Sequence, residues 1–176
     1  MEKRGVEQIL CLGDLMNAGI AKILAHQSLP TFLIWGNNDG EKVDIVKASY
    51  REGSQLTVSL NTYDFLELGG KQIFISHYDD LAHPMAESGR FDAVFFGHTH
   101  LVSKEKVNEC HVVNPGELCA QKSGNCTMAI YDTSSDVVEL ITLDNTISLK
   151  SDYVDEYFSD NMDRLSFRSK DSFKNS

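Results

Sequence analysis

Four short apolar runs, each followed by a small residue and then a polar one, constrain this chain more than any other feature of its sequence. The runs are Leu10-Cys11-Leu12, Leu33-Ile34-Trp35, Ile73-Phe74-Ile75 and Val94-Phe95-Phe96. Each is short and continuously apolar, as strands in the interior of a sheet are. Stretches that can form helices lie between several of them, and this alternation is typical of an α/β fold.

The remaining pattern predicts two helices and three hairpins. The helices are expected over residues 17–28 and 41–50. Their predicted apolar faces are Ile20, Ile23, Leu24 and Gln27 in the first and Val43, Val46 and Tyr50 in the second. Gly69-Gly70 predicts a two-residue hairpin turn between strands at 62–68 and 71–76. Further hairpins are expected over 103–113 and 126–143.

Composition and charge exclude several classes of protein. A chain of 176 residues has room for one domain with a sizeable core. Its net charge of −10, from 16 basic and 26 acidic residues, repels polyanions and makes a nucleic acid an unlikely partner. No apolar run reaches the roughly 20 residues that a membrane helix needs, and the first residues do not resemble a signal peptide. We therefore expect no membrane partner and a cytoplasmic location.

The cysteines and three of the histidines give no sign of a site. Cys11, Cys110, Cys119 and Cys126 show no zinc-ligand spacing, so we expect reduced thiols that pack as small hydrophobes. Three other histidines, His26, His83 and His111, follow no buried strand. We expect them at the surface, or in contact with the ligands of a site and not with the bound ion itself.

The composition changes near the end of the chain. We expect one domain over residues 1–146 and a polar tail over 147–176. In the tail, Val154, Phe158, Met162 and Leu165 recur at helical spacing and predict an amphipathic helix that could bind a protein partner.

The polar residues after the four apolar runs carry the functional signal. They occur in Gly13-Asp14, Gly36-Asn37-Asn38-Asp39, Ser76-His77 and Gly97-His98-Thr99-His100. In open α/β sheets the ligand site lies at the carboxyl ends of the strands, so these side chains should converge. Each segment alone is consistent with an ordinary turn or helix cap. Together they predict a divalent-metal site, and the spacing of His98 and His100 suits two neighbouring ions.

These segments, with Asn17 and Asn114-Pro115-Gly116, resemble the calcineurin-like metallophosphoesterases, in particular their small single-domain phosphodiesterase branch. The resemblance covers approximately residues 7–143. It implies an α/β fold with two mixed β-sheets in a sandwich flanked by helices. It also implies that Asp14 bridges two metal ions. By the same resemblance, Asn37, His77 and His98 bind one ion, His100 binds the other, and Asn38 and Asp39 lie at the catalytic centre.

The chain departs from the family pattern in three places. The family's opening strand with its Asp-x-His motif is absent from this sequence, so we expect an N-terminally incomplete domain, a sandwich lacking the first strand, with weak binding of the ion at His100. Either the natural start lies upstream of Met1, or the chain has lost half of one metal site. Asn38 stands where many relatives have a histidine that assists the leaving group. Tyr78 follows His77 where relatives usually have glycine, and its ring could stack on a leaving group or cover the core.

The resemblance and the donor types together predict an enzyme. We expect a metal-dependent phosphoesterase that hydrolyses a small phosphodiester with metal-activated water. The resemblance favours two Mn²⁺ ions, while Zn²⁺, Fe and Ni²⁺ suit the same ligands. The alternative is a catalytically impaired phosphoesterase-like scaffold that binds a protein partner. The missing Asp-x-His favours this alternative, and the five retained ligand residues favour the enzyme.

Overall fold

The computed structural model describes residues 4–143. The elements of this region follow one another in the order β1 (Ile9–Cys11), α1 (Ala18–His26), β2 (Thr31–Leu33), α2 (Lys42–Ser49), β3 (Leu56–Val58), β4 (Tyr63–Leu68), β5 (Lys71–Ser76), α3 (Ala82–Glu87), β6 (Ala93–Phe96), β7 (Ser103–Val107), β8 (Cys110–Asn114), β9 (Cys126–Asp132) and β10 (Val137–Leu143). No helix in residues 4–143 has the length and apolar character required to span a membrane.

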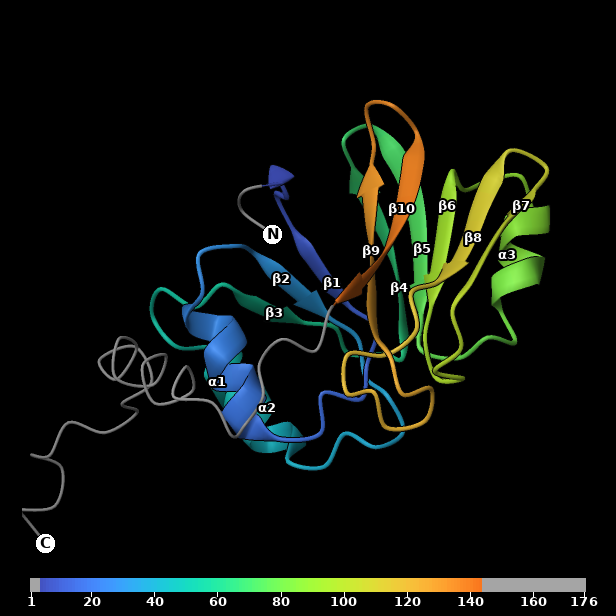
Figure 1. The fold of residues 1–176 in the computed structure, drawn as a ribbon. Coiled ribbons are helices and arrows are strands. Elements are labelled where there is room, and N and C mark those ends of the chain that lie inside the picture. The colour runs from blue at the N-terminus through green and yellow to red at the C-terminus, as the bar shows by residue number, and fades with distance from the viewer. Residues whose placement is uncertain (1–3, 144–176) are drawn as a thin grey trace, which may run out of the picture. The chain divides into compact units, whose positions relative to one another are not determined.

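The strands form two sheets and a separate hairpin (Figure 1). The first sheet is parallel, in the order β1-β2-β3. The second has the order β4-β5-β6-β8-β7, with β5, β6 and β8 parallel and the two outer strands antiparallel to their neighbours. β9 and β10 pair with each other in antiparallel register. The predicted α/β fold with helices around its sheets is confirmed, as are all three predicted hairpins.

The main core lies between the two sheets. The inner faces of the strands and the β9–β10 hairpin contribute the buried residues Ile34, Ile73, Ile75, Ala93, Phe95, Val113 and Val138. Alternate residues of the same central strands point to the opposite face of the second sheet, where α3 covers them. Both faces of β5, β6 and β8 are therefore buried, which explains their continuous apolar sequences.

Helices α1 and α2 cover the other face of the first sheet, but not through the faces that the sequence predicts. α1 buries Ala18, Ala21 and Ala25, whereas Ile20 and Ile23 are 42% and 48% exposed. Because alanine side chains are small, the backbone of α1 can lie close to the sheet, and the larger side chains of the sheet fill the space between them. The predicted face of α1 is therefore wrong at Ile20 and Ile23, whereas Leu24 packs partly against the core as predicted.

The predicted face of α2 is also wrong. Ile45 and Ala48 are buried, whereas Val43 and Tyr50 are 69% and 85% exposed. Val46 packs partly against the same core. In a helix of eight residues, two apolar faces fit the sequence about equally, and docking on the sheet selects between them.

Several smaller features differ from expectation. The short strand β3 and the helix α3 are not predicted, because neither has a clear period in its sequence. Within residues 4–143, β1 pairs with β2 alone, so the first apolar run forms a partly buried edge strand instead of the interior strand that its composition predicts. The predicted domain boundary at 146 and the amphipathic segment 154–165 lie outside the described residues.

The cysteines divide into two kinds. Cys110 is buried and Cys11 is half-buried. Loss of hydration raises the pKa of both thiols to about 11, which suits a small, unreactive hydrophobe. Cys119 is exposed, so the expectation of burial is wrong at that position. Its surroundings are described with the site below.

Candidate metal centre

Two glycines bring the loops after β1 and β2 into contact. A Cβ atom on Gly13, whose φ is +94°, would lie 2.6 Å from the backbone nitrogen of Gly36 and 2.6 Å from His77 Nδ1. A Cβ atom on Gly36 would lie 2.1 Å from Asp14 Oδ1. Side chains at these positions would separate Asp14 from His77, so both glycines are required by the close approach of the loops.

The carboxylate of Asp39 joins the same two loops through hydrogen bonds to their backbone. Its Oδ2 accepts hydrogen bonds from the backbone nitrogens of Gly36 at 2.7 Å and Asp14 at 3.1 Å. Its Oδ1 accepts a third from Met16 at 2.8 Å. The side chain is only 6% exposed, and both oxygens are occupied by backbone donors. The arrangement holds Asp14 in place.

Three side chains converge on one point. Asn37 Oδ1 lies 2.9 Å from His77 Nε2 and 2.9 Å from His98 Nδ1. The two histidine nitrogens are 3.3 Å apart. Asp14 Oδ1 lies 3.6 Å from His77 Nε2. Asp14, Asn37, His77 and His98 are therefore brought together as the sequence predicts.

A backbone hydrogen bond fixes the orientation of the His77 ring within this cluster. His77 is 1% exposed, and its Nδ1 lies 2.7 Å from the carbonyl oxygen of Leu12, which can only accept a hydrogen bond. Nδ1 therefore donates to this oxygen, and Nε2 is the ring nitrogen that faces Asn37 Oδ1. Ligand atoms about 2.0–2.2 Å from one ion lie roughly 3 Å apart at angles near 90°. The distances among these nitrogen and oxygen atoms therefore fit the ligands of a divalent cation.

Asn38 fixes the carboxylate of Asp14. Its backbone nitrogen donates to Oδ1 and its Nδ2 donates to Oδ2, both at 2.8 Å. Partial burial alone would raise the pKa of Asp14, but these two hydrogen bonds and the nearby histidines hold it below its ordinary value. Asp14 is therefore ionised, as a metal ligand must be.

The loop after β6 carries both His98 and His100 in a strained conformation. Their φ values are +63° and +65°, in the left-handed region that side chains other than glycine seldom adopt. Asn114, which is fully buried, stabilises the loop by donating from Nδ2 to Gly97 O at 2.8 Å and to Thr99 Oγ1 at 2.9 Å. Strained backbone that is held in this way is common at functional sites.

Tyr78 packs beside the cluster. Its ring centroid lies 5.0 Å from that of His77 and 5.0 Å from that of His98, edge to face in both cases. The half-buried ring therefore supports the two imidazoles, in addition to any contact with a ligand.

His100 has partners that the sequence reading missed. Its Nδ1 lies 2.6 Å from Oε2 of Glu117, and the thiol of Cys119 donates to the same oxygen at 3.1 Å. Burial alone would raise the pKa of Glu117, but hydrogen bonds from His100, Ser123 and Cys119 hold it far below its ordinary value. The one available signal was the position of Glu117 directly after the Asn114-Pro115-Gly116 segment.

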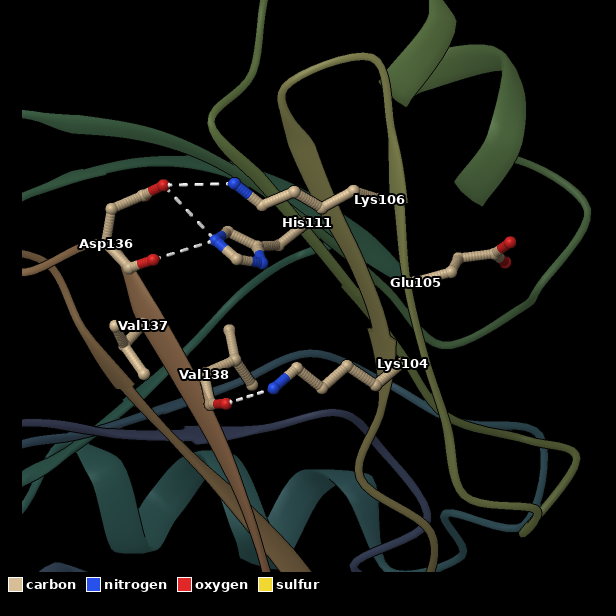
Figure 2. Close-up of a pocket in the computed structure, with 7 residues that line it drawn as sticks. All are labelled: Lys104, Glu105, Lys106, His111, Asp136, Val137 and Val138. Atoms are coloured by element: carbon tan, nitrogen blue, oxygen red, sulfur yellow. Dashed lines mark hydrogen bonds and ion pairs between the residues drawn. The ribbon is translucent and has the colours of Figure 1, made fainter.

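A second polar cluster surrounds Asp136, in the turn between β9 and β10 (Figure 2). Asp136 Oδ2 lies 3.3 Å from His111 Nε2 and 3.5 Å from Lys106 Nζ. Lys104 Nζ donates to the carbonyl oxygen of Val138. His111 is 5% exposed and joins β8 to this turn, so its expected place at the surface or behind the metal cluster is wrong.

The sheets and their loops define an α/β protein in which nitrogen and oxygen atoms suited to bind a metal ion gather at the carboxyl ends of the strands. The chain belongs to the calcineurin-like phosphoesterase superfamily, since the Calcineurin-like phosphoesterase superfamily domain matches residues 1–136. The resemblance drawn from the sequence is confirmed. Members of this superfamily typically bind divalent metals and act on phosphorylated compounds.

Individual relatives agree with this family. Phosphodiesterase MJ0936 of Methanocaldococcus jannaschii is 28% identical over 141 residues, which are 79% of this chain and 84% of that protein. A solved archaeal phosphodiesterase superposes with a TM-score of 0.71 at 26% identity, over 81% of this chain and 86% of the other. Vacuolar protein sorting 29 of Cryptosporidium parvum shares the fold, with a TM-score of 0.53 at 14% identity over 78% and 81% of the two chains.

Proposed function

We propose that this protein is a metal-dependent phosphoesterase that hydrolyses a small phosphodiester with a metal-activated water. The observation that carries the proposal is the convergence of His77 Nε2, Asn37 Oδ1 and His98 Nδ1, which lie within 2.9–3.3 Å of one another. The similarity to phosphodiesterase MJ0936 supports a phosphodiester as the substrate.

Each residue has a role in this proposal. Asn37, His77 and His98 would hold one ion, Asp14 would be shared by both ions, and His100 would be a ligand of the second. Bound divalent ions polarise phosphoryl oxygens and lower the pKa of water to about 7.

The two residues that we place at the catalytic centre act on Asp14. Asn38 orients the carboxylate of Asp14 through two hydrogen bonds, and Asp39 fixes its backbone. Neither is placed to supply a proton: the amide of Asn38 has no acidic proton near neutral pH, and the oxygens of Asp39 already accept from backbone donors. Protonation of the leaving group therefore comes from water, and good leaving groups should be favoured.

The charge of the protein limits the substrate. With a net charge of −10, the protein repels long polyanions at a distance. Bound cations would neutralise the charge of one phosphate locally. We therefore infer a small phosphorylated substrate. Mn²⁺ is the preferred ion, and Zn²⁺, Fe and Ni²⁺ suit the same nitrogen and oxygen ligands.

The test is hydrolysis of bis(p-nitrophenyl) phosphate in the presence of Mn²⁺. His98→Ala should lower the rate by more than roughly 100-fold, because replacing even a residue behind a metal ligand commonly costs 10- to 100-fold. His83→Ala is the matched control, since His83 is exposed and pairs with Glu105 at 3.3 Å on the outer surface. This variant should retain the full rate.

The same assay separates the enzyme from the scaffold. Equal rates for His98→Ala and the unmodified protein would contradict the proposed site. An unmodified protein that binds Mn²⁺ and leaves aryl phosphodiesters intact would favour the catalytically impaired scaffold and a protein partner.

A further inference from the structure

Three different metal-binding groups lie together beyond the cluster described above. His100 Nδ1, Glu117 Oε2 and Cys119 Sγ all lie within 4.8 Å of one another. Glu117 Oε2 is central, at 2.6 Å from the imidazole nitrogen and 3.1 Å from the sulfur. Within residues 4–143, this is the one group of three or more His, Cys, Asp or Glu side chains with such spacing.

Hydrogen bonds to one oxygen of Glu117 fix the carboxylate, so that its other oxygen points toward His100 and Cys119. Oε1 accepts hydrogen bonds from the backbone nitrogens of Lys122 at 2.8 Å and Ser123 at 2.6 Å, and from Ser123 Oγ at 2.8 Å. Among residues 4–143, the hydrogen-bond partners of Oε2 are His100 and Cys119. Hydrogen bonds of this kind behind a ligating carboxylate orient it and strengthen metal binding.

The exposed fractions of the three side chains suit a metal site that is shielded from water but open to solvent on one side. The Glu117 side chain is 4% exposed and that of His100 is 16% exposed, so the central carboxylate is shielded from bulk water. Cys119 is exposed at the surface of the same loop. An ion could therefore arrive from the side of the thiol and meet ligands that are already in place.

We propose that His100, Glu117 and Cys119 form a second metal site that takes a thiophilic divalent ion, with Zn²⁺ as the expected occupant. Imidazole, carboxylate and thiolate are the three ligand types that Zn²⁺ uses in proteins, whereas Mn²⁺ prefers oxygen. The proposal rests on the proposed function in one respect, that His100 is a ligand of a second ion, and it names two further protein ligands of that ion.

The charges and protons balance. A metal ion at His100 Nδ1 would need the lone pair of that nitrogen, so the ring proton would reside on Nε2. The Cys119 thiol releases its proton to solvent and binds as thiolate. One carboxylate and one thiolate neutralise the two charges of the ion. With Asp14, which the proposed function also assigns to this ion, these three ligands make up a tetrahedral set of four.

The test uses Co²⁺, whose bonds to thiolate absorb in the near ultraviolet while its bonds to nitrogen and oxygen alone do not. Titration of the full chain should give this absorption band, and Cys119→Ser should abolish it. Cys126→Ser is the matched control, because Cys126 is another cysteine, at the start of β9, and lies outside the cluster. It should leave the band intact.

Two further variants separate this proposal from the proposed hydrolysis. His98→Ala removes a ligand of the first cluster and should leave the thiolate band unchanged. Ser123→Ala removes one hydrogen bond behind Glu117 and should weaken Co²⁺ binding at the thiolate site by roughly 10-fold. The absorption is read without substrate, so loss of activity alone does not affect the result.

Two results would overturn the proposal. Saturation with Co²⁺ without a thiolate band would show that Glu117 is only a hydrogen-bond partner of His100 and Cys119. A band that survives Cys119→Ser and disappears in Cys126→Ser would place the thiolate ligand elsewhere.

Discussion

At the scale of single residues, Asp39 shows how one buried carboxylate organises the candidate site. Its two oxygens accept three backbone hydrogen bonds, from the loops that carry Asp14 and Asn37. A buried donor that loses its partner costs roughly 1–3 kcal/mol. The residue therefore stabilises the fold and also sets the position of Asp14.

Replacing Asp39 with alanine should lower the free energy of unfolding by about 2–4 kcal/mol, because the donors are left without their acceptor. Urea denaturation followed by circular dichroism measures the change. Asp44→Ala serves as the control, since Asp44 forms an exposed pair with Lys47 at 3.0 Å, and such pairs contribute about 0–1 kcal/mol. Similar small losses in both variants would mean that water replaces the carboxylate of Asp39 without cost.

At the scale of elements, the start of α1 connects helix formation to the site. Asn17 has extended backbone angles and its Oδ1 accepts from the backbone nitrogens of Gly19 at 2.9 Å and Ile20 at 3.2 Å. Glu41, just before α2, accepts from the nitrogen of Ala18 at 2.9 Å. The first turn of α1 is thus capped by its own sequence and by the neighbouring helix.

Asn17→Ala should therefore destabilise the protein by about 1 kcal/mol, as loss of an N-cap usually does. Asn17→Asp preserves the acceptor and should stay within about 0.5 kcal/mol of the unmodified protein. Thermal unfolding of the two variants side by side gives the comparison. An aspartate variant as unstable as the alanine variant would show that the cap hydrogen bonds contribute little.

At the scale of the whole molecule, Asp136 ties the β9–β10 turn to the second sheet. Hydrogen bonds from Tyr131 and Lys71 hold the pKa of Asp136 well below its ordinary value, and His111 contributes to the same effect. In return, burial and the hydrogen bond to Asp136 raise the pKa of the Tyr131 hydroxyl well above its ordinary range. Lys106 lies within 3.5 Å of the same carboxylate.

The depressed pKa of Asp136 gives a stability contribution with a defined pH dependence. A carboxyl whose pKa is lower when folded stabilises the protein above its ordinary pKa of 3.8, and the contribution disappears as the pH falls below that value. The difference in melting temperature between the unmodified protein and Asp136→Asn should therefore be largest near neutral pH. It should shrink progressively below pH 3.8. A difference that stays constant down to pH 2.5 would contradict this role.

The sequence by itself determined the fold class and the positions of the candidate ligands along the chain. Continuous apolar runs identified the buried strands β5 and β6, and the Gly69-Gly70 turn identified a hairpin, because these signals depend on local geometry and burial alone. Asp14, Asn37, His77 and His98 could be grouped because they follow strands whose carboxyl ends meet. The role of these residues as metal ligands stays a prediction.

Only the tertiary structure decided which helix faces are buried and which side chains meet across the loops. α1 buries its alanines and exposes Ile20 and Ile23, since the faces of a helix are selected by the shape of the surface that it covers. Glu117 meets His100 from 17 residues further along the chain, by way of an irregular loop that has no period to read. Contacts of this kind depend on the paths of two loops at once, and no local pattern of residues encodes them.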